Sequence, residues 1–459
     1  MTSLVINHWA NHPTQISGAG LWWLPGNPAK RTYGTFEFTS QGGMLTTSGE
    51  LIGIKEPWPE QATILGELDN GDRVTLLEAR VGSIRVNNDD VQGEDWKISS
   101  LLIGTWAALG MDETFSTLSF RSLRLSEWAS SRPRVSGARH SMEVKWRESV
   151  RFDLVSLGWL TLQWEQQASF TDHSANMTIH PTAVFHAEDV RSLRQLWDEF
   201  VVPFVEFMML ATGGRDGIQS LRLRGPVPAG TKHPALVTPN VDWYTSTLPV
   251  GDETPDSRQQ HLIKFRELEE RLPGVIQRWF ELERQHRFAL RQFSAVVLSP
   301  SGSNEDSFDR TVRALEVWHR LDSDETLMTS EQYGALLDRL ADAAPEHSTF
   351  IRQRMQYQNA PSLKQRLDAL VGEAGEPVGA AIAHSPKFIR RTVDTRNELT
   401  HRADAGTHFD PPNLRAAEHL WQLVLRAVLL RRLGFEGSEL EPMLSRTPDG
   451  TLIRFPSKL

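Results

Sequence analysis

The stretch Thr35-Phe36-Glu37-Phe38-Thr39 alternates polar and apolar side chains, which is typical of a β-strand with one buried face. The same alternation recurs at residues 73–77 and 142–146, and turn-forming clusters at 41–43 and 69–72 separate such runs. Repeated short strands divided by turns predict a β-sandwich or a barrel for about the first 185 residues.

Farther along the chain the apolar spacing becomes helical. Residues 189–210 carry apolar side chains at helical spacing, with a bend expected at Pro203. From residue 259 to 434 nearly every segment has this spacing, although Pro273 is expected to interrupt the first helix. The chain is therefore predicted to be an α+β protein, with a β-rich N-terminal domain followed by an all-α helical bundle.

Capping residues mark the ends of the predicted C-terminal helices. Ser362 and Gln365 form a capping-box pattern for a helix that ends at Gly372. Ser385-Pro386 predicts the start of a helix that runs to about His401. Pro412 is expected to open the last long helix, and Gly434 to close it.

Composition divides the chain into three parts. Residues 1–250 form the β-rich domain, including the helix near 189–211; residues 251–300 form connecting helices; and residues 301–459 form the helical domain. The boundary is placed at 247–257, which is rich in Pro, Gly and acidic residues.

Charge and residue usage exclude several functional classes. The 459 residues include no cysteine, which rules out disulfides, a cysteine nucleophile and thiolate metal sites. The net charge of −9 means that nucleic-acid binding requires a local basic patch. The N-terminus lacks the pattern of a signal peptide, and no apolar stretch approaches the roughly 20 residues of a membrane span. The sequence therefore predicts a cytoplasmic protein without a membrane partner.

Three motifs resemble functional sites, but the residues of each argue against that function. Residues 225–232 resemble a phosphate-binding loop, but Thr231 replaces its lysine and two prolines remove backbone donors. His173, His180 and His186 lack the spacing of a metal site, so packing or surface roles are favoured. Trp22-Trp23 suggests a sugar-binding sandwich, but tryptophans at such positions usually lie in the core.

The candidate active segment is Lys387-Phe388-Ile389-Arg390-Arg391-Thr392-Val393-Asp394-Thr395-Arg396-Asn397-Glu398-Leu399-Thr400-His401-Arg402. Its five basic and two acidic residues give this helix a local charge of +3. Asn397 and His401 are four residues apart and share one helix face, while the long side chain of Arg396 can reach the same edge.

Arg396, Asn397 and His401 have the functional groups for cutting RNA without a metal or another cofactor. Histidine can take the proton from the 2′-hydroxyl or give one to the leaving 5′-oxygen near neutral pH. Arginine can stabilise the charge that develops on the phosphate oxygens, and asparagine can orient the phosphate or the imidazole. Ordinary helix-end capping explains the same residues equally well. A non-catalytic module that binds RNA or protein, joined to a ligand-sensing β-domain, is the alternative.

Residues 394–401 resemble the Arg-polar-x3-His signature of HEPN domains, which are helical RNA-binding and RNA-cleaving modules. Ala314-Leu315-Glu316 and the segment 362–367 resemble two other helices of that superfamily. In the first half, Gly20-Leu21-Trp22-Trp23-Leu24-Pro25, residues 71–76 and residues 123–128 resemble the ApeA N-terminal domain. Together they resemble ApeA-type bacterial anti-phage proteins.

This resemblance implies a defence ribonuclease of the abortive-infection type, with tRNA as the expected target and a phage-derived trigger. It implies at least a dimer, in which two copies of Arg396 and His401 line one basic cleft. Glu316 is implied as a supporting residue, although an ion pair with Arg320 one turn away explains it equally well. The remaining basic residues of the segment are expected to contact RNA: Lys387, Arg390, Arg391 and Arg402.

Overall fold

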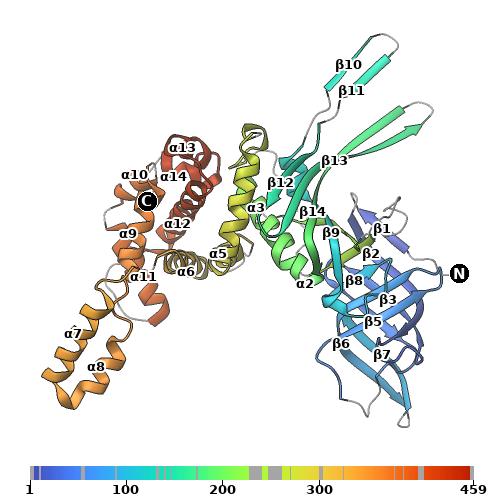
Figure 1. Cartoon of the computed structure of the whole chain (residues 1–459), viewed down its shortest axis with the longest axis horizontal. Helices are drawn as coiled ribbons and strands as arrows, with labels where there is room; N and C mark the ends of the chain where they lie inside the picture. The colour runs from blue at the N-terminus through green and yellow to red at the C-terminus, as the bar shows by residue number, and fades with distance from the viewer. Residues whose placement is uncertain are drawn as a thin grey trace. The chain divides into compact units, whose positions relative to one another are not determined.

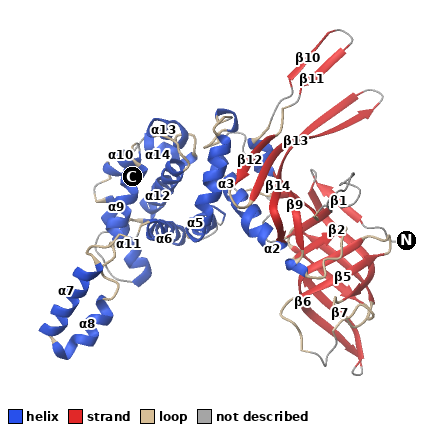
Figure 2. Ribbon diagram, in the orientation of Figure 1, coloured by secondary structure: helices blue, strands red, loops and turns tan. Residues whose placement is uncertain are grey.

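The computed structural model describes residues 5–9, 12–52, 57–87, 90–130, 134–138, 141–145, 147–171, 174–214, 216–226, 240–246, 261–268, 270–298, 303–323, 325–376, 378–385, 387–401 and 408–454. The chain divides into two compact units, which are Met1–Met209 with Gly214–Ser257, and Leu210–Gly213 with Arg258–Leu459. The first unit is mostly strand and the second is helical (Figure 2). The prediction of an α+β chain with a β-rich N-terminal part is therefore confirmed. The predicted boundary at 247–257 lies outside the described residues.

The first unit begins with a closed β-barrel. Its strands pair in the ring order β2-β3-β4-β7-β6-β5, and β5 returns to β2. All pairings in this ring are antiparallel. The barrel strands are β2 (His12–Trp23), β3 (Thr32–Thr39), β4 (Gly42–Thr47), β5 (Ala62–Leu68), β6 (Arg73–Asn87) and β7 (Asp90–Ile98), and β1 (Val5–Trp9) pairs with β2. Of the two architectures predicted, the structure adopts the barrel.

The barrel interior is filled by large apolar side chains. Trp22 is fully buried, donates from its indole nitrogen to the Gly34 carbonyl at 3.0 Å, and meets the ring of Phe36 edge-on. Trp23 is also buried. The sugar-binding interpretation of Trp22-Trp23 is therefore wrong, because neither ring is available for stacking on a ligand.

An open sheet continues from β6 of the barrel (Figure 1). Its order is β8-β16-β15-β9-β14-β13-β12, and every pairing is antiparallel. Its strands are β8 (Ser100–Ile103), β9 (Thr114–Ser122), β12 (Val150–Leu154), β13 (Gly158–Thr171), β14 (Ser174–Ser192), β15 (Ile218–Arg224) and β16 (Val241–Thr245). A separate hairpin is formed by β10 (Arg134–Ala138) and β11 (Ser141–Lys145).

Helices cover one face of this sheet. They are α1 (Leu123–Trp128), α2 (Leu193–Leu196) and α3 (Val202–Thr212). Phe120 of β9 and Phe185 of β14 both contact Phe204 of α3 edge-on, at centroid distances of 5.5 and 5.9 Å. These contacts place α3 on the face of the sheet to which Phe120 and Phe185 point.

The helix predicted at 189–210 is partly wrong. Strand β14 continues to Ser192, whose side chain then caps α2. A π-helical turn at 197–201 follows, and α3 begins just before Pro203. Proline lacks an N–H and its ring crowds the carbonyl four residues earlier, so a widened turn at this point accommodates it.

The second unit is a bundle of helices. They are α5 (Leu272–Leu298), α6 (Asn304–Asp322), α7 (Ser330–Ala343), α8 (Ser348–Met355), α9 (Leu363–Ala374), α10 (Val378–Ala383), α11 (Phe388–His401), α12 (Pro411–Arg432), α13 (Gly437–Leu444) and α14 (Thr451–Arg454). Helix α12 is central, since nearly all its residues from 420 to 430 are buried, and it packs against α6, α9 and α10. Helices α7 and α8 pair with each other, and α8 has no buried residue.

Several predicted helix boundaries shift. Pro273 lies in the first turn of α5 instead of interrupting it, and α12 opens at Pro411 instead of Pro412. Helix α9 runs past Gly372 to Ala374, and Gly375 provides the left-handed residue at its end, with φ of +70°. Gly434 ends α12 in the same way, as predicted. Of the helices in these ranges, none combines the length and the apolar character that crossing a bilayer requires.

Gly66 provides a test of the barrel packing, because a Cβ at this position would lie 2.3 Å from the Trp22 ring. We expect Gly66→Ala to lower the free energy of unfolding by about 1–3 kcal/mol, since a rigid buried ring has no room to move. Urea unfolding followed by tryptophan fluorescence reports this unit, because twelve of the fifteen tryptophans precede residue 257. Gly26→Ala is the matched control, since a Cβ there meets nothing within 4 Å. Equal midpoints for the two variants would contradict the packing argument.

Candidate functional site

The candidate site is carried by α11, whose inner face is fixed by packing and hydrogen bonds. Phe388 lies between the rings of Phe409 and Trp421, with centroids at 5.4 and 5.3 Å. The buried Thr392 hydroxyl accepts a hydrogen bond from the Trp421 indole at 2.9 Å. The buried Thr395 hydroxyl accepts one from the backbone N–H of Phe409, also at 2.9 Å. These positions recur at i, i+4 and i+7, so they set which residues of α11 face outward.

The start of α11 differs from the prediction. The helix begins at Phe388, and Lys387 before it has a left-handed backbone with φ of +62°. Ser385 is buried, and its carbonyl accepts a hydrogen bond from the Phe388 N–H at 3.1 Å. Ser385-Pro386 therefore does not open the helix, because the left-handed turn at Lys387 separates it from the first helical residue. Pro386 lies outside the described residues.

Arg396 lies next to the inner face of α11 and pairs with an acidic residue of α6. Its Nη2 atom is 3.8 Å from Oε2 of Glu316, and the two side chains are 26% and 15% exposed. Glu316 also accepts a hydrogen bond from Arg320 at 2.7 Å, one turn along α6. The expected ion pair with Arg320 is therefore present, and the same carboxylate also contacts Arg396 of α11. The role of Glu316 in supporting a site stays a prediction.

A third arginine adds positive charge to this cluster. Arg366 of α9 is 5% exposed and donates from Nε to the Pro361 carbonyl at 2.9 Å. Burial lowers the pKa of Arg366, the neighbouring Arg320 lowers it further, and Glu316 raises it. The three guanidinium groups of Arg320, Arg366 and Arg396 thus come from three helices. Arg320 and Arg396 contact the Glu316 carboxylate, whereas Arg366 is influenced by its charge without a direct contact being given.

His319 belongs to the same cluster. It is buried on α6, with its Nδ1 atom 3.5 Å from Nη1 of Arg366. Burial lowers the pKa of His319 and the charge of Arg366 lowers it further, whereas Glu325, Asp322 and Glu373 raise it. Sequence reasoning missed His319 and Arg366. The available signal was Arg366 itself, since it falls within the apolar stripe of α9 that includes Leu367, Leu370 and Ala374.

Asn397 and His401 follow Arg396 on the same helix. Asn397 is half-buried. His401 is the last residue of α11, one turn beyond Asn397, and its side chain lies outside what the structure describes. The structure brings Arg396 together with Glu316, and it places Asn397 and His401 on one continuous helix with that arginine.

The other predicted RNA contacts differ in how they are held. Lys387 and Arg390 are exposed, and Arg390 lies 3.7 Å from Asp394 one turn away. Arg391 is half-buried, with its guanidinium 4.3 Å from the centre of the Phe409 ring. Arg402 lies outside the described residues. Lys387 and Arg390 are thus the more accessible of the described cations, while Arg391 also stabilises the chain that follows α11.

The chain beyond α11 is attached to it again by polar contacts. Nδ1 of His408 lies 3.1 Å from a carboxylate oxygen of Glu398. Asp410 then caps α12 by accepting from the N–H of Asn413. The far end of the α11–α12 connection is thereby held against the same helix that carries Arg396.

Metal-ligating groups are not gathered in the part of the chain that the structure describes. No set of three His, Asp or Glu side chains there is arranged to hold an ion. His186 stacks on the Trp159 ring at 4.9 Å, and His180 lies on the same strand of the first unit. His173 falls outside the described residues.

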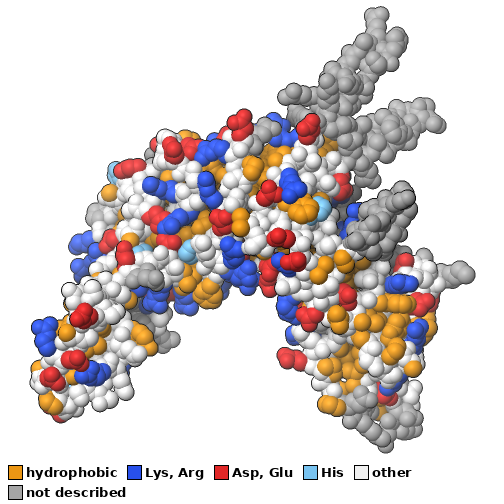
Figure 3. All heavy atoms as spheres, viewed as in Figure 1, with side chains coloured by type: hydrophobic (Ala, Val, Ile, Leu, Met, Phe, Trp, Pro, Cys, Tyr) orange, Lys and Arg blue, Asp and Glu red, His pale blue; other side chains and the backbone are white. Residues whose placement is uncertain are grey.

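Charged side chains of both signs cover the outside of this unit. Figure 3 shows basic and acidic groups interspersed over the hairpin of α7 and α8, where Arg352 pairs with Asp338 at 2.8 Å. Around Glu316, by contrast, two arginines contact one carboxylate, and Arg366 lies on the neighbouring helix α9. Three further acidic groups, Asp322, Glu325 and Glu373, act on the His319 side of this cluster. The guanidinium groups at Glu316 suit a phosphate-bearing ligand.

Comparison with protein-family models finds two matches. The model described as Apea-like HEPN matches residues 310–439. The model described as ApeA N-terminal domain 1 matches residues 18–279. Comparisons with curated proteins and with solved structures yield no match.

The Thr392 hydroxyl tests how α11 is anchored. We expect Thr392→Val to lower the free energy of unfolding by about 1–3 kcal/mol, because the buried Trp421 indole N–H loses its acceptor. The measurement is urea unfolding followed by circular dichroism at the helical band. Thr400→Val, at an exposed position of the same helix, is the matched control and should change little. Indistinguishable curves for the two variants would show that the hydroxyl does not anchor the helix.

Proposed function

Because the chain belongs to the ApeA family, with an ApeA N-terminal domain joined to a HEPN domain, we propose that it is a defence endoribonuclease whose active helix is α11. At the level of the family, the two domains are those of anti-phage defence proteins with a HEPN-type nuclease. The proposal assigns the cleavage to Arg396, Asn397 and His401, and the support of Arg396 to Glu316.

The observation that carries this proposal is the ion pair between α6 and α11. An arginine that merely caps a helix end would face solvent or the last carbonyl groups of its own helix. Arg396 is instead three-quarters buried and is directed toward Glu316 of another helix. Arg320 donates to the same carboxylate, whose charge also raises the pKa of Arg366. A restrained guanidinium in a cationic cluster is the group that stabilises a developing phosphorane.

In the proposed reaction, a base removes the proton from the 2′-hydroxyl of the RNA. The 2′-oxygen forms a bond to the adjacent phosphorus while the bond from phosphorus to the 5′-oxygen breaks, and an acid protonates the departing oxygen. The products are a 2′,3′-cyclic phosphate and a 5′-hydroxyl. Arg396 neutralises charge on the non-bridging oxygens, and Asn397 orients the phosphate.

The two proton transfers favour paired active helices. One imidazole is in a single protonation state at any moment, whereas the reaction uses a base on one side of the phosphorus and an acid on the other. Two copies of α11 from two protomers would supply two His401 imidazoles and two Arg396 guanidinium groups. The active form is therefore proposed to be at least a dimer.

The expected substrate is tRNA, and the β-rich unit is proposed to sense a phage-derived trigger. The chain carries a net charge of −9, so long-range attraction to bulk RNA is weak. Cleavage then depends on a substrate that fits the local cationic cluster and on the geometry of the paired subunits. The need for both a fitting substrate and correctly paired subunits suits an enzyme that must leave host RNA intact until infection.

Substitutions on α11 test the nuclease assignment. We expect Arg396→Ala to reduce cleavage on the order of 10²–10³-fold, because the phosphorane loses its guanidinium. We expect His401→Ala to reduce it on the order of 10²–10⁴-fold, because proton transfer is lost. End-group mapping of total RNA from expressing cells should find cyclic phosphate and 5′-hydroxyl ends for the wild type alone, and EDTA should leave the purified activity intact.

Arg352→Ala is the matched control, since it removes an exposed, ion-paired arginine from α8 of the same unit. It should leave cleavage unchanged. Undiminished cleavage by the Arg396→Ala, His401→Ala double variant would refute the assignment. RNA binding by the wild type without any cleaved ends would instead support the non-catalytic module.

Glu316 is proposed to position Arg396, not to contact the RNA. Glu316→Gln should therefore lower kcat by about 10-fold or more, because the guanidinium loses its charged partner, while KM changes little. Glu316→Asp, which restores the charge one methylene shorter, should recover part of kcat. The measurement is single-turnover cleavage of a purified tRNA. A purely structural role would lower the unfolding midpoint of Glu316→Gln and leave kcat per folded enzyme unchanged.

A further inference from the structure

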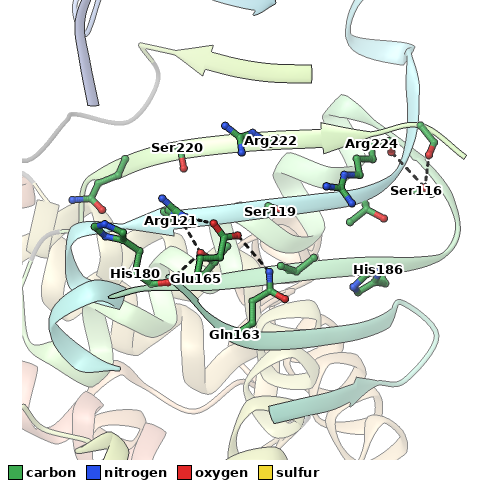
Figure 4. Close-up of a pocket in the computed structure, with 15 residues that line it drawn as sticks. Ser116, Ser119, Arg121, Gln163, Glu165, His180, His186, Ser220, Arg222 and Arg224 are labelled. Atoms are coloured by element: carbon green, nitrogen blue, oxygen red, sulfur yellow. Dashed lines mark hydrogen bonds and ion pairs between the residues drawn. The ribbon is translucent and has the colours of Figure 1, made fainter. Parts of the chain in front are cut away.

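A polar groove lies on the face of the open sheet opposite to α3 in the first unit. It is formed by β9, β13, β14 and β15 and has a volume of about 450 Å³ (Figure 4). This size falls within the range of small-molecule sites. The nuclease site described above belongs to the other unit, so this groove is a separate feature.

Strand alternation explains why the groove is polar. On β9, the residues Leu118 and Phe120 face the covering helices, so Thr117, Ser119 and Arg121 face the groove. Strands β13 and β14 follow the same rule, whereas on β15 a register shift between Ile218 and Ser220 brings two consecutive residues, Gln219 and Ser220, to the groove. Their groove-lining residues are Gln163 and Glu165 of β13, His180, Thr182, Val184 and His186 of β14, and Gln219, Ser220, Arg222 and Arg224 of β15.

Positive charge exceeds negative charge along the groove. Arg121 pairs with Glu165 and also donates to the Thr182 hydroxyl at 2.9 Å. Arg222 pairs with Asp242 of the neighbouring strand at 2.9 Å. Arg224, two residues farther on the same face, donates at 2.6 Å to the side-chain oxygen of Asn240, which is neutral. The lining therefore includes three guanidinium groups and one carboxylate.

Two histidines lie toward the two ends of the groove (Figure 4). Burial lowers the pKa of His180, and the charge of Arg121 lowers it further while Glu165 raises it. Burial also lowers the pKa of His186, with further lowering by Arg151 and Arg224. Both rings are thus neutral donors and acceptors at pH 7, in a field set mainly by arginine.

His186 also provides an aromatic surface beside a cation. Its ring is parallel to that of Trp159 within 12°, and Arg151 lies 4.5 Å from the centre of the same indole. The strand register aligns Trp159, His186, Thr117 and Arg224 in one row across four strands. A flat ring and a guanidinium in one row match the two parts of a nucleotide, which are its base and its phosphates.

We propose that this groove binds a nucleotide, with its phosphates at Arg222 and Arg224 and its base beside His186. The class is a small phosphorylated ligand of nucleotide size and not a folded RNA, because the volume corresponds to one such molecule. Through this site the β-rich unit would bind a small ligand, whether or not the helical unit cleaves RNA.

Calorimetric titration of the full chain tests the site, with ATP and inorganic pyrophosphate as the probes. We expect ATP to bind, and Arg224→Gln to weaken both probes about 10- to 100-fold, because a charge-assisted hydrogen bond is lost. His186→Ala should weaken ATP but leave pyrophosphate unchanged, since it removes the ring and no charge at pH 7.5. Arg80→Gln, at an exposed position of the barrel, is the matched control and should bind as the wild type does.

Three results would overturn the proposal. They are the absence of ATP binding at millimolar concentration, equal affinity of Arg224→Gln and the wild type, and pyrophosphate binding as tight as that of ATP. A tetranucleotide RNA that binds while ATP does not would assign the groove to RNA instead. Near-UV circular dichroism of each variant verifies that the sheet is intact, so a loss of affinity is not a loss of fold.

Discussion

The carboxylate of Glu316 is the constraint on which the helical site depends. Guanidinium groups of α6 and α11 contact it, and its charge also raises the pKa of Arg366 of α9, which is almost fully buried. The charge of Arg320 lowers the pKa of Arg366, so like charges repel here, and burial strengthens the repulsion because the surroundings screen it poorly. Glu316 offsets this repulsion and links Arg320 to Arg396. Without it, Arg396 would have no charged partner among the described residues, and α11 would present a mobile side chain instead of a restrained one.

A feature of the site could be predicted from the sequence when it depends only on residues that are neighbours in the chain. The placement of Arg396, Asn397 and His401 on one helix was predictable because it depends on neighbouring residues of the sequence. Their catalytic roles stay predictions. Arg366 and His319 were not predicted, since they join the site only through the packing of α6 against α9. The predicted cap at Ser385-Pro386 was wrong for another reason. The prediction rested on residue types that favour a helix start, whereas a left-handed turn at Lys387 determines where α11 begins.

The β-rich unit shows the same limit on a larger scale. Alternation within single strands predicted the strands themselves and, through Trp22, a tryptophan-filled core. It did not decide between a sandwich and a barrel, because closure depends on β5 pairing with both β2 and β6. The polar groove could not be predicted from the sequence for the same reason. Its lining comes from residues 116 to 225, and only the register between strands shows that Thr117, His186 and Arg224 form one row.

Both candidate sites concentrate positive charge in a chain that is acidic overall. Each uses arginines from more than one element, and in each the pKa of a histidine is lowered first by burial and then by a neighbouring arginine. Since exposed charges are screened beyond about 10 Å, the net charge of −9 weakens distant attraction without cancelling these local fields. An anion must therefore fit the site before it gains much binding energy. The fit of the anion to the site therefore precedes electrostatic attraction in its recognition.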